Sequence, residues 1–186
     1  AGNVQSVMYA MDRIGASYLW TDDEQEIRTA DKVIFPGVGE ASTAMSYLRE
    51  KGLDKVIPSL TQPVLGTCVG MQLMCRHSEE NNTTCMGIFD LDVKRFDSSN
   101  FKVPHVGWNE LENLAQNPLL KDLPDSKFLY YVHSYYCELS DFTIAKTHYV
   151  LDFAGLMHKD NFYAMQAHPE KSGLVGEQIL RNFLSL

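Results

Sequence analysis

The chain has 186 residues, 45% of them hydrophobic and 22% charged, which predicts a single globular domain over residues 1–186 with a sizeable core. The formal net charge of −8 argues against nucleic acid as a partner, because a phosphate-binding surface needs clustered positive charge. No apolar run reaches the roughly 20 residues of a membrane-spanning helix, so no membrane association is expected. The four cysteines lack Cys-x-x-Cys spacing, and in a domain of this size they favour a reducing, cytoplasmic location.

Helix and strand patterns alternate in the first half of the chain. Residues 3–15 carry an apolar stripe of helical period that stops at Gly15, and a short strand is expected at 17–20. Further strands are expected at 31–36 and 63–68, and helices at 41–51, 56–60 and 71–77. Such alternation predicts a mostly parallel sheet with helices on both faces.

The second half of the chain is richer in strands. We expect strands at 91–96, 128–134, 143–151 and 162–166, and a terminal helix at 173–186. Together with the first half they predict a three-layer α/β fold whose parallel sheet has an antiparallel extension. Because the first helix of such a fold ordinarily follows a central strand, we also expect that about one strand's length, roughly 5–10 residues, is missing before Ala1.

The most specific local pattern is Gly66-Thr67-Cys68-Val69-Gly70. It matches the strand–turn–helix elbow that presents a nucleophile, and its glycines allow the backbone to pack closely around the turn. The N-terminus of the following helix favours a thiolate, and the Val69 amide can point toward a developing oxyanion. Taken alone, the pattern is equally compatible with an inert structural cysteine.

A thiol nucleophile needs a base, and the base needs a group that orients it. His168-Pro169-Glu170, after the strand at 162–166, supplies both, although alone it also fits a surface histidine beside a solvated glutamate. Pro36-Gly37-Val38-Gly39 ends an earlier strand. Because parallel strands present their carboxyl ends at one edge of a sheet, we expect these segments and the cysteine elbow to share one site.

With these three segments together, the sequence resembles the class I (triad) glutamine amidotransferases over nearly its whole length, from Gly2-Asn3 to the terminal helix. The resemblance extends to Gly70-Met71-Gln72, to Val-Pro-His-Val-Gly-Trp-Asn at 103–109, and to the stretches at 130–136 and 166–172. More narrowly, the chain resembles the glutaminase subunits that supply ammonia to a (β/α)8-barrel cyclase subunit in histidine biosynthesis. One departure is Ala167, where the family usually has Phe.

The resemblance implies a role for each matching residue. It implies Cys68 as the nucleophile, His168 as base and acid, and Glu170 as the group that orients His168. The expected oxyanion hole comprises Gly37, Val38, Gly39 and Val69, and the expected contacts to the substrate's amino and carboxylate ends come from Gln72, Glu80, Ser134 and Tyr135. A solvated acidic turn stays open as the alternative for Glu80, and a plain strand end stays open for Ser134.

The family also implies L-glutamine as substrate and the barrel cyclase as partner. The positions that match the partner interface are Asn3, Trp108, Asn109, Tyr130 and Lys171. Core packing, the commoner fate of aromatic residues, stays open for Trp108 and Tyr130. The resemblance further implies low activity in the isolated subunit and a partner-induced rearrangement of the loop at 37–39, where glycines on both sides of Val38 permit a peptide flip.

The expected chemistry is acyl transfer from the side-chain amide of glutamine through a thioester on Cys68, which water then hydrolyses. No metal or organic cofactor is expected. Two alternatives stay open: a binding protein of the same fold without turnover, and a cysteine peptidase or another hydrolase that acts on a different small amide. Gln72 and the Ser134-Tyr135 pair argue against another hydrolase, because these residues suit a free amino acid.

Overall fold

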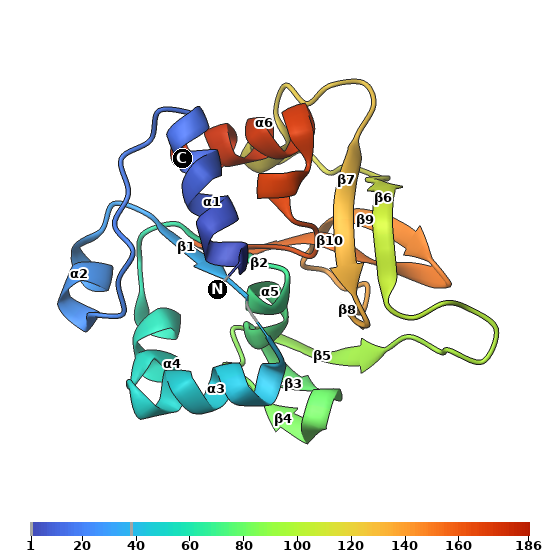
Figure 1. Ribbon diagram of the computed structural model, residues 1–186, viewed down its shortest axis with the longest axis horizontal. Helices are drawn as coiled ribbons and strands as arrows, with labels where there is room; N and C mark the ends of the chain where they lie inside the picture. The colour runs from blue at the N-terminus through green and yellow to red at the C-terminus, as the bar shows by residue number, and fades with distance from the viewer. Residues whose placement is uncertain (1, 38) are drawn as a thin grey trace.

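The computed structural model describes residues 2–37 and 39–186, with side chains from residue 4 onward. A five-stranded sheet runs through the molecule (Figure 1) in the order β1 (Val33–Pro36), β2 (Val64–Thr67), β11 (Phe162–Met165), β10 (Leu151–Lys159) and β9 (Thr143–Tyr149). Strands β1, β2 and β11 pair in parallel, whereas β10 and β9 continue the sheet with antiparallel pairing. The expected parallel sheet with an antiparallel extension is confirmed.

Helices cover both faces of this sheet (Figure 1). One face carries α3 (Ala41–Glu50), α4 (Leu53–Val56), the 3-10 turn η1 (Ile57–Ser59) and α5 (Val69–Leu73), and the other carries α1 (Gly2–Arg13) and α6 (Gly173–Leu184). Val64 of β2 lies in the same core as Met45 of α3, while its neighbour Leu65 lies in the opposite core with Phe183 of α6. This alternation is the period of two that a strand buried on both faces imposes. None of the helices among the described residues is long and apolar enough to cross a membrane.

A smaller sheet and a hairpin complete the fold. The smaller sheet has the order β4 (Thr83–Thr84), β3 (Cys75–Ser78), β5 (Phe89–Arg95) and β8 (Tyr135–Cys137). The hairpin pairs β6 (His105–Glu110) with β7 (Phe128–His133), so that Trp108 lies opposite Tyr130. The remaining 3-10 turns are η2 (Glu80–Asn82), η3 (Pro118–Leu120) and η4 (Pro169–Lys171).

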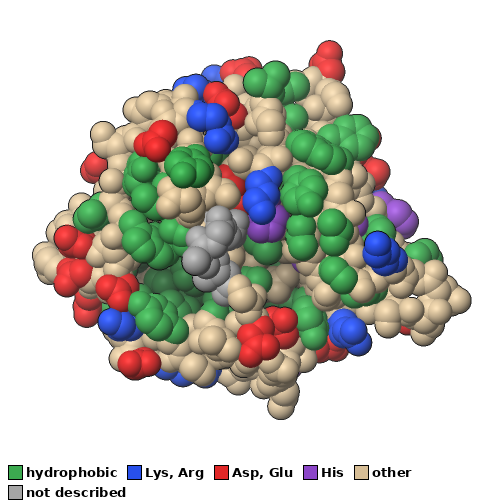
Figure 2. Space-filling view, in the orientation of Figure 1, with side chains coloured by type: hydrophobic (Ala, Val, Ile, Leu, Met, Phe, Trp, Pro, Cys, Tyr) green, Lys and Arg blue, Asp and Glu red, His purple; other side chains and the backbone are tan. Residues whose placement is uncertain are grey.

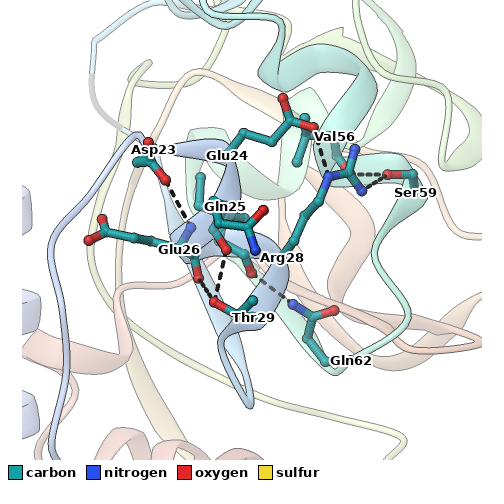
Figure 3. A network of polar contacts seen from close by, with 10 residues as sticks. Asp23, Glu24, Gln25, Glu26, Arg28, Thr29, Val56, Ser59 and Gln62 are labelled. Atoms are coloured by element: carbon teal, nitrogen blue, oxygen red, sulfur yellow. Dashed lines mark hydrogen bonds and ion pairs between the residues drawn. The ribbon is translucent and has the colours of Figure 1, made fainter.

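One short helix, α2 (Glu24–Thr29), has no counterpart among the expected elements. Asp23 caps it by accepting a hydrogen bond from the Glu26 N–H at 3.0 Å. Arg28 donates to Glu24 at 2.8 Å and to the Ser59 hydroxyl at 3.0 Å, which ties the helix to η1 (Figure 3). Only Ile27 of this helix is buried, so polar contacts rather than an apolar stripe define it.

The strand expected at 17–20 is absent, and that prediction was wrong. The side chains of Tyr18, Leu19 and Trp20 are exposed by 42%, 66% and 61%. An apolar run becomes a strand only where another strand pairs with it, and β1, at the edge of the described sheet, pairs with β2 alone.

Two other expected elements have different boundaries. The helix expected at 71–77 ends at Leu73, because Cys75–Ser78 pairs with β5 and becomes strand β3. The strand expected at 143–151 is present as β9 but ends at Tyr149, because Val150 has a φ of 65° and turns the chain into β10. The first departure arises from pairing with a later segment, which local periodicity does not report, and the second from a turn at a valine, which carries no turn signal in the sequence.

Candidate active site

Cys68 lies on a tight turn between β2 and α5, as the pattern of glycines predicts. Its φ of 54° and ψ of −118° lie in a region that residues other than glycine rarely adopt, at a cost of about 1–3 kcal/mol. The turn is held by the Cys68 N–H, which donates to the Met165 carbonyl at 2.8 Å. A Cβ added at Gly70 would lie 2.1 Å from the Phe35 carbonyl oxygen, so glycine is required where α5 passes the end of β1.

His168 and Glu170 meet Cys68 at the carboxyl edge of the parallel strands. The Nδ1 atom of His168 lies 2.9 Å from Glu170 Oε1, and Cys68 is close enough to the same imidazole to raise its pKa. The His168 N–H donates to the Tyr130 carbonyl at 2.9 Å. Ser172 also joins this segment to β7, because its hydroxyl donates to the His168 carbonyl at 2.5 Å and accepts from the Tyr130 N–H at 2.9 Å.

The surroundings of His168 stabilise its charged form. Burial alone lowers the pKa of His168, but the hydrogen bonds and charges of Cys68 and Glu170 outweigh it and raise the pKa to about 9. At neutral pH the imidazole is therefore protonated, which suits a group that gives a proton to a leaving amine.

Glu170 is positioned to orient His168 rather than to contact solvent. Its side chain is fully buried, and among the described residues its Oε2 atom has no hydrogen-bond partner. Ala167, the departure from the family pattern, is completely buried in the core between the sheet, α1 and α6. The contact between His168 and Glu170 is nevertheless kept at 2.9 Å.

The residues expected to form an oxyanion hole lie on both sides of the elbow. Val69 is the first residue of α5, where an amide has no partner within the helix. The Gly37 N–H donates to the Thr67 carbonyl at 3.0 Å, so in this conformation that amide is engaged with β2. Gly39 has a φ of +77°, and Val38 lies outside the described residues.

The residues expected to hold glutamine form two groups. Gln72 is buried, and its Nε2 donates to the Tyr135 carbonyl at 3.0 Å and to Gln166 Oε1 at 2.9 Å. The half-buried Ser134 and Tyr135 lie at the junction of β7 and β8. The Glu80 carboxylate instead accepts from the Ala41 N–H at 2.7 Å, at the start of α3 and beside the loop at 37–39.

An exposed apolar face covers the hairpin of β6 and β7, directly beside Cys68. Val106, Trp108, Phe128 and Val132 are exposed by 54%, 56%, 44% and 37%, and hydrophobic side chains gather over these strands in Figure 2. With this exposure, Trp108 is a surface residue and not part of the core. Its ring lies edge-on to that of Tyr130, with centroids 5.9 Å apart. The carbonyl oxygen of Val132 lies 3.9 Å from Cys68 Sγ.

The other positions expected at an interface are spread around this face. Lys171 is exposed in η4, one residue after Glu170. Asn109 is half-buried and donates to the His148 carbonyl at 2.8 Å, so its amide also holds the hairpin to β9. The side chain of Asn3 lies outside the described residues.

The family model for class-I glutamine amidotransferases matches residues 3–186. The chain belongs to the class-I glutamine amidotransferases. Among curated relatives, the imidazole glycerol phosphate synthase subunit HisH of Bacteroides fragilis (strain YCH46) is 55% identical over 188 residues, which cover 100% of this chain and 95% of the relative. The protein of the same name from Idiomarina loihiensis is 45% identical over 184 residues, which cover 99% of this chain and 93% of the relative.

Solved structures of other glutamine amidotransferases have the same fold. One superposes with a TM-score of 0.70 over 97% of this chain and 92% of its own, at 19% identity. A glutamine amidotransferase from Thermotoga maritima gives a TM-score of 0.63 over 96% of this chain and 74% of its own, at 16% identity.

Proposed function

We propose that this chain is the glutaminase subunit of imidazole glycerol phosphate synthase, which hydrolyses L-glutamine and delivers the ammonia to a (β/α)8-barrel cyclase subunit in histidine biosynthesis. The identity of 55% to a curated HisH protein over the full chain supports the assignment to this subunit. The observation that carries the chemistry is the buried line of Cys68, His168 and Glu170, in which Glu170 Oε1 lies 2.9 Å from His168 Nδ1.

In the proposed mechanism, the Cys68 thiolate attacks the side-chain amide carbon of glutamine, and the C–N bond breaks. His168 enters this step protonated and gives its proton to the departing ammonia, which agrees with the pKa of about 9 that its partners produce. The neutral imidazole then takes a proton from water, which attacks the thioester and releases glutamate. The buried Glu170 stabilises the imidazolium and keeps its Nδ1 proton pointed away from Cys68.

The stabilisation of the oxyanion needs a change in the loop at 37–39. Val69 supplies one amide at the start of α5, whereas the Gly37 amide is bonded to the Thr67 carbonyl at 3.0 Å. We infer that the second donor comes from this loop after a peptide rearrangement, and that partner docking favours it. Low turnover in the isolated chain follows from this arrangement.

The cyclase is proposed to dock on the apolar face of the β6–β7 hairpin. Contiguous exposed apolar side chains of this kind mark protein interaction sites on soluble proteins. Because Val132 of this face lies with its carbonyl 3.9 Å from Cys68 Sγ, ammonia released there is already at the interface. Lys171 is proposed to contribute the charged rim of the same interface, and Asn3 a further contact.

Steady-state release of glutamate by the full chain, with and without the cyclase subunit and its nucleotide ligand, tests the proposal. We expect low turnover alone, strong stimulation by the cyclase, and loss of turnover in Cys68→Ala with cyclase binding intact. Equal turnover with and without the cyclase contradicts the proposed partner, and full turnover in Cys68→Ala contradicts the proposed nucleophile.

A further inference from the structure

A line of polar side chains runs from the exposed hairpin to the helix that carries Cys68. Asn109 Nδ2 lies 3.3 Å from His105 Nε2, and His105 Nδ1 lies 2.9 Å from His133 Nε2. His133 Nδ1 lies 2.7 Å from the Tyr135 carbonyl oxygen. Both imidazoles are buried, and the proposed mechanism uses neither of them.

The same Tyr135 carbonyl also accepts the Gln72 amide, at 3.0 Å. Gln72 lies one turn after Cys68 in α5, and its N–H points to the Cys68 carbonyl at 3.4 Å. The line of polar groups therefore ends at a residue that we assign to glutamine binding, and it begins on the hairpin that we assign to partner docking.

The chemistry of the groups sets one direction for every proton in this line. The Tyr135 carbonyl can only accept, so His133 carries its proton on Nδ1 and has a bare Nε2. His105 must then donate from Nδ1, which leaves its Nε2 to accept from the Asn109 amide. Each group donates toward Tyr135, and one tautomer of each histidine satisfies the whole line.

Both histidines stay neutral, as this arrangement requires. Burial lowers the pKa of His105 to about 4. For His133, burial is again the largest cause and outweighs the hydrogen bond to the Tyr135 carbonyl, which raises the pKa; the charge of His168 lowers the pKa further, to about 3. A proton on His133 Nε2 would face the donating Nδ1 of His105 at 2.9 Å.

We propose that His133 is a positioning residue for glutamine, and that His105 fixes the tautomer in which His133 holds the Tyr135 carbonyl. This carbonyl accepts from the Gln72 amide, so the bond to His133 fixes both the Gln72 side chain and the Ser134-Tyr135 segment in place for the substrate. The inference rests on the proposed function, because it takes glutamine as the substrate. The aromatic rings of Tyr131 and Tyr149 stack on His105, with centroids 5.2 and 4.1 Å away, and fix the plane of its ring.

Kinetics of the full chain in complex with the cyclase test the inference, with kcat and KM for glutamine measured separately. In His133→Leu the Tyr135 carbonyl loses a donor, and we expect KM to rise about tenfold while kcat falls less than about threefold, as the loss of one hydrogen bond predicts. In His133→Asn the side-chain amide can replace the Nδ1–H donor, and most of the glutamine affinity should return. In His105→Phe the stacking surface is kept but the donor is lost, and we expect a smaller rise in KM.

His158→Leu is the matched control. His158 also bonds a carbonyl two residues along the chain, that of Asp160 at 2.7 Å, and its ring also stacks on a tyrosine, but it lies outside the proposed site. Its KM should equal that of the wild type. A KM in His133→Leu equal to that of the control overturns the inference. A wild-type complex without glutaminase activity instead overturns the proposed function.

Nitrogen NMR of the wild-type imidazoles gives a second test that does not depend on the folding of any variant. We expect His133 with its proton on Nδ1 and no titration between about pH 5 and pH 9. A proton on Nε2, or a titration in that range, overturns the inference.

Discussion

Replacing Gly70 by Ala changes the free energy of unfolding through two opposing effects, helix propensity and a steric clash. Gly70 lies inside α5, where alanine is ordinarily favoured by about 1 kcal/mol. The new Cβ, however, would lie 2.1 Å from the Phe35 carbonyl oxygen and 3.3 Å from the Gly37 nitrogen. Because the oxygen belongs to the backbone of β1 and cannot rotate away, α5 or β1 must move. Overpacking of this kind costs about 1–3 kcal/mol, and we place this backbone clash near or above the upper end.

The expected net loss in the free energy of unfolding is about 2 kcal/mol, which corresponds to a fall in Tm of about 4–8 °C for a domain of this size. Urea unfolding followed by circular dichroism measures it. Gly87→Ala is the control for a substitution without a steric clash, because no heavy atom lies within 4 Å of the position that the new methyl group would take. Gly87 has a φ of +71°, so the only expected cost is that of a left-handed backbone at alanine, about 1–2 kcal/mol. Gly70→Ala should also lose glutamine turnover, since it displaces the elbow. A Gly70→Ala protein as stable as the wild type would show that α5 and the Phe35 carbonyl do not restrict this position.

Buried side chains give three further predictions. In Cys68→Ala the pKa of His168 should fall from about 9, as histidine NMR can measure, because the interactions with Cys68 that raise it are lost. The folded pKa of His168 lies above its unfolded value of 6.5, so its contribution to stability is complete below about pH 6.5 and is lost as the pH rises through about 9. Urea unfolding across this range should show the free energy of unfolding fall with pH in the wild type, and fall less in Cys68→Ala. Tyr131→Phe removes the hydroxyl that lies 2.7 Å from Thr147 Oγ1 in the core, and should cost about 1–3 kcal/mol in urea unfolding, whereas Tyr9→Phe at the surface should cost under about 0.5 kcal/mol.

The elements that were predicted correctly bury a regular apolar pattern. Strand β2 is a short continuous buried run, and helix α3 has its buried residues at the helical period. Helix α2 and strand β6 escaped prediction because few of their side chains are buried: Ile27 in the helix, and His105 in the strand. Their positions are set by polar contacts and by pairing with β7, and neither leaves a periodic signal.

The proposed triad was accessible to sequence reasoning because Cys68, His168 and Glu170 lie just after the ends of strands, in short and unusual motifs. Ser172 and the two buried histidines were not, since their roles depend on contacts between distant segments. His105 and His133 are 28 residues apart in sequence and meet only because β6 pairs with β7. The Ser172 hydroxyl is 42 residues from the Tyr130 amide that it accepts from. All three residues lie in stretches that carry the family resemblance, at 103–109, 130–136 and 166–172, but the local sequence does not show which distant group each one contacts.

In the proposed mechanism, Cys68 attacks glutamine and carries the glutamyl group as a thioester. The intact mass of the chain after acid quenching of glutamine turnover in the presence of the cyclase, followed by peptide mapping, detects this intermediate. The proposed mechanism predicts an added mass of one glutamyl group, located on Cys68 and absent in Cys68→Ala. Turnover without any adduct on Cys68, together with activity retained in Cys68→Ala, would contradict it.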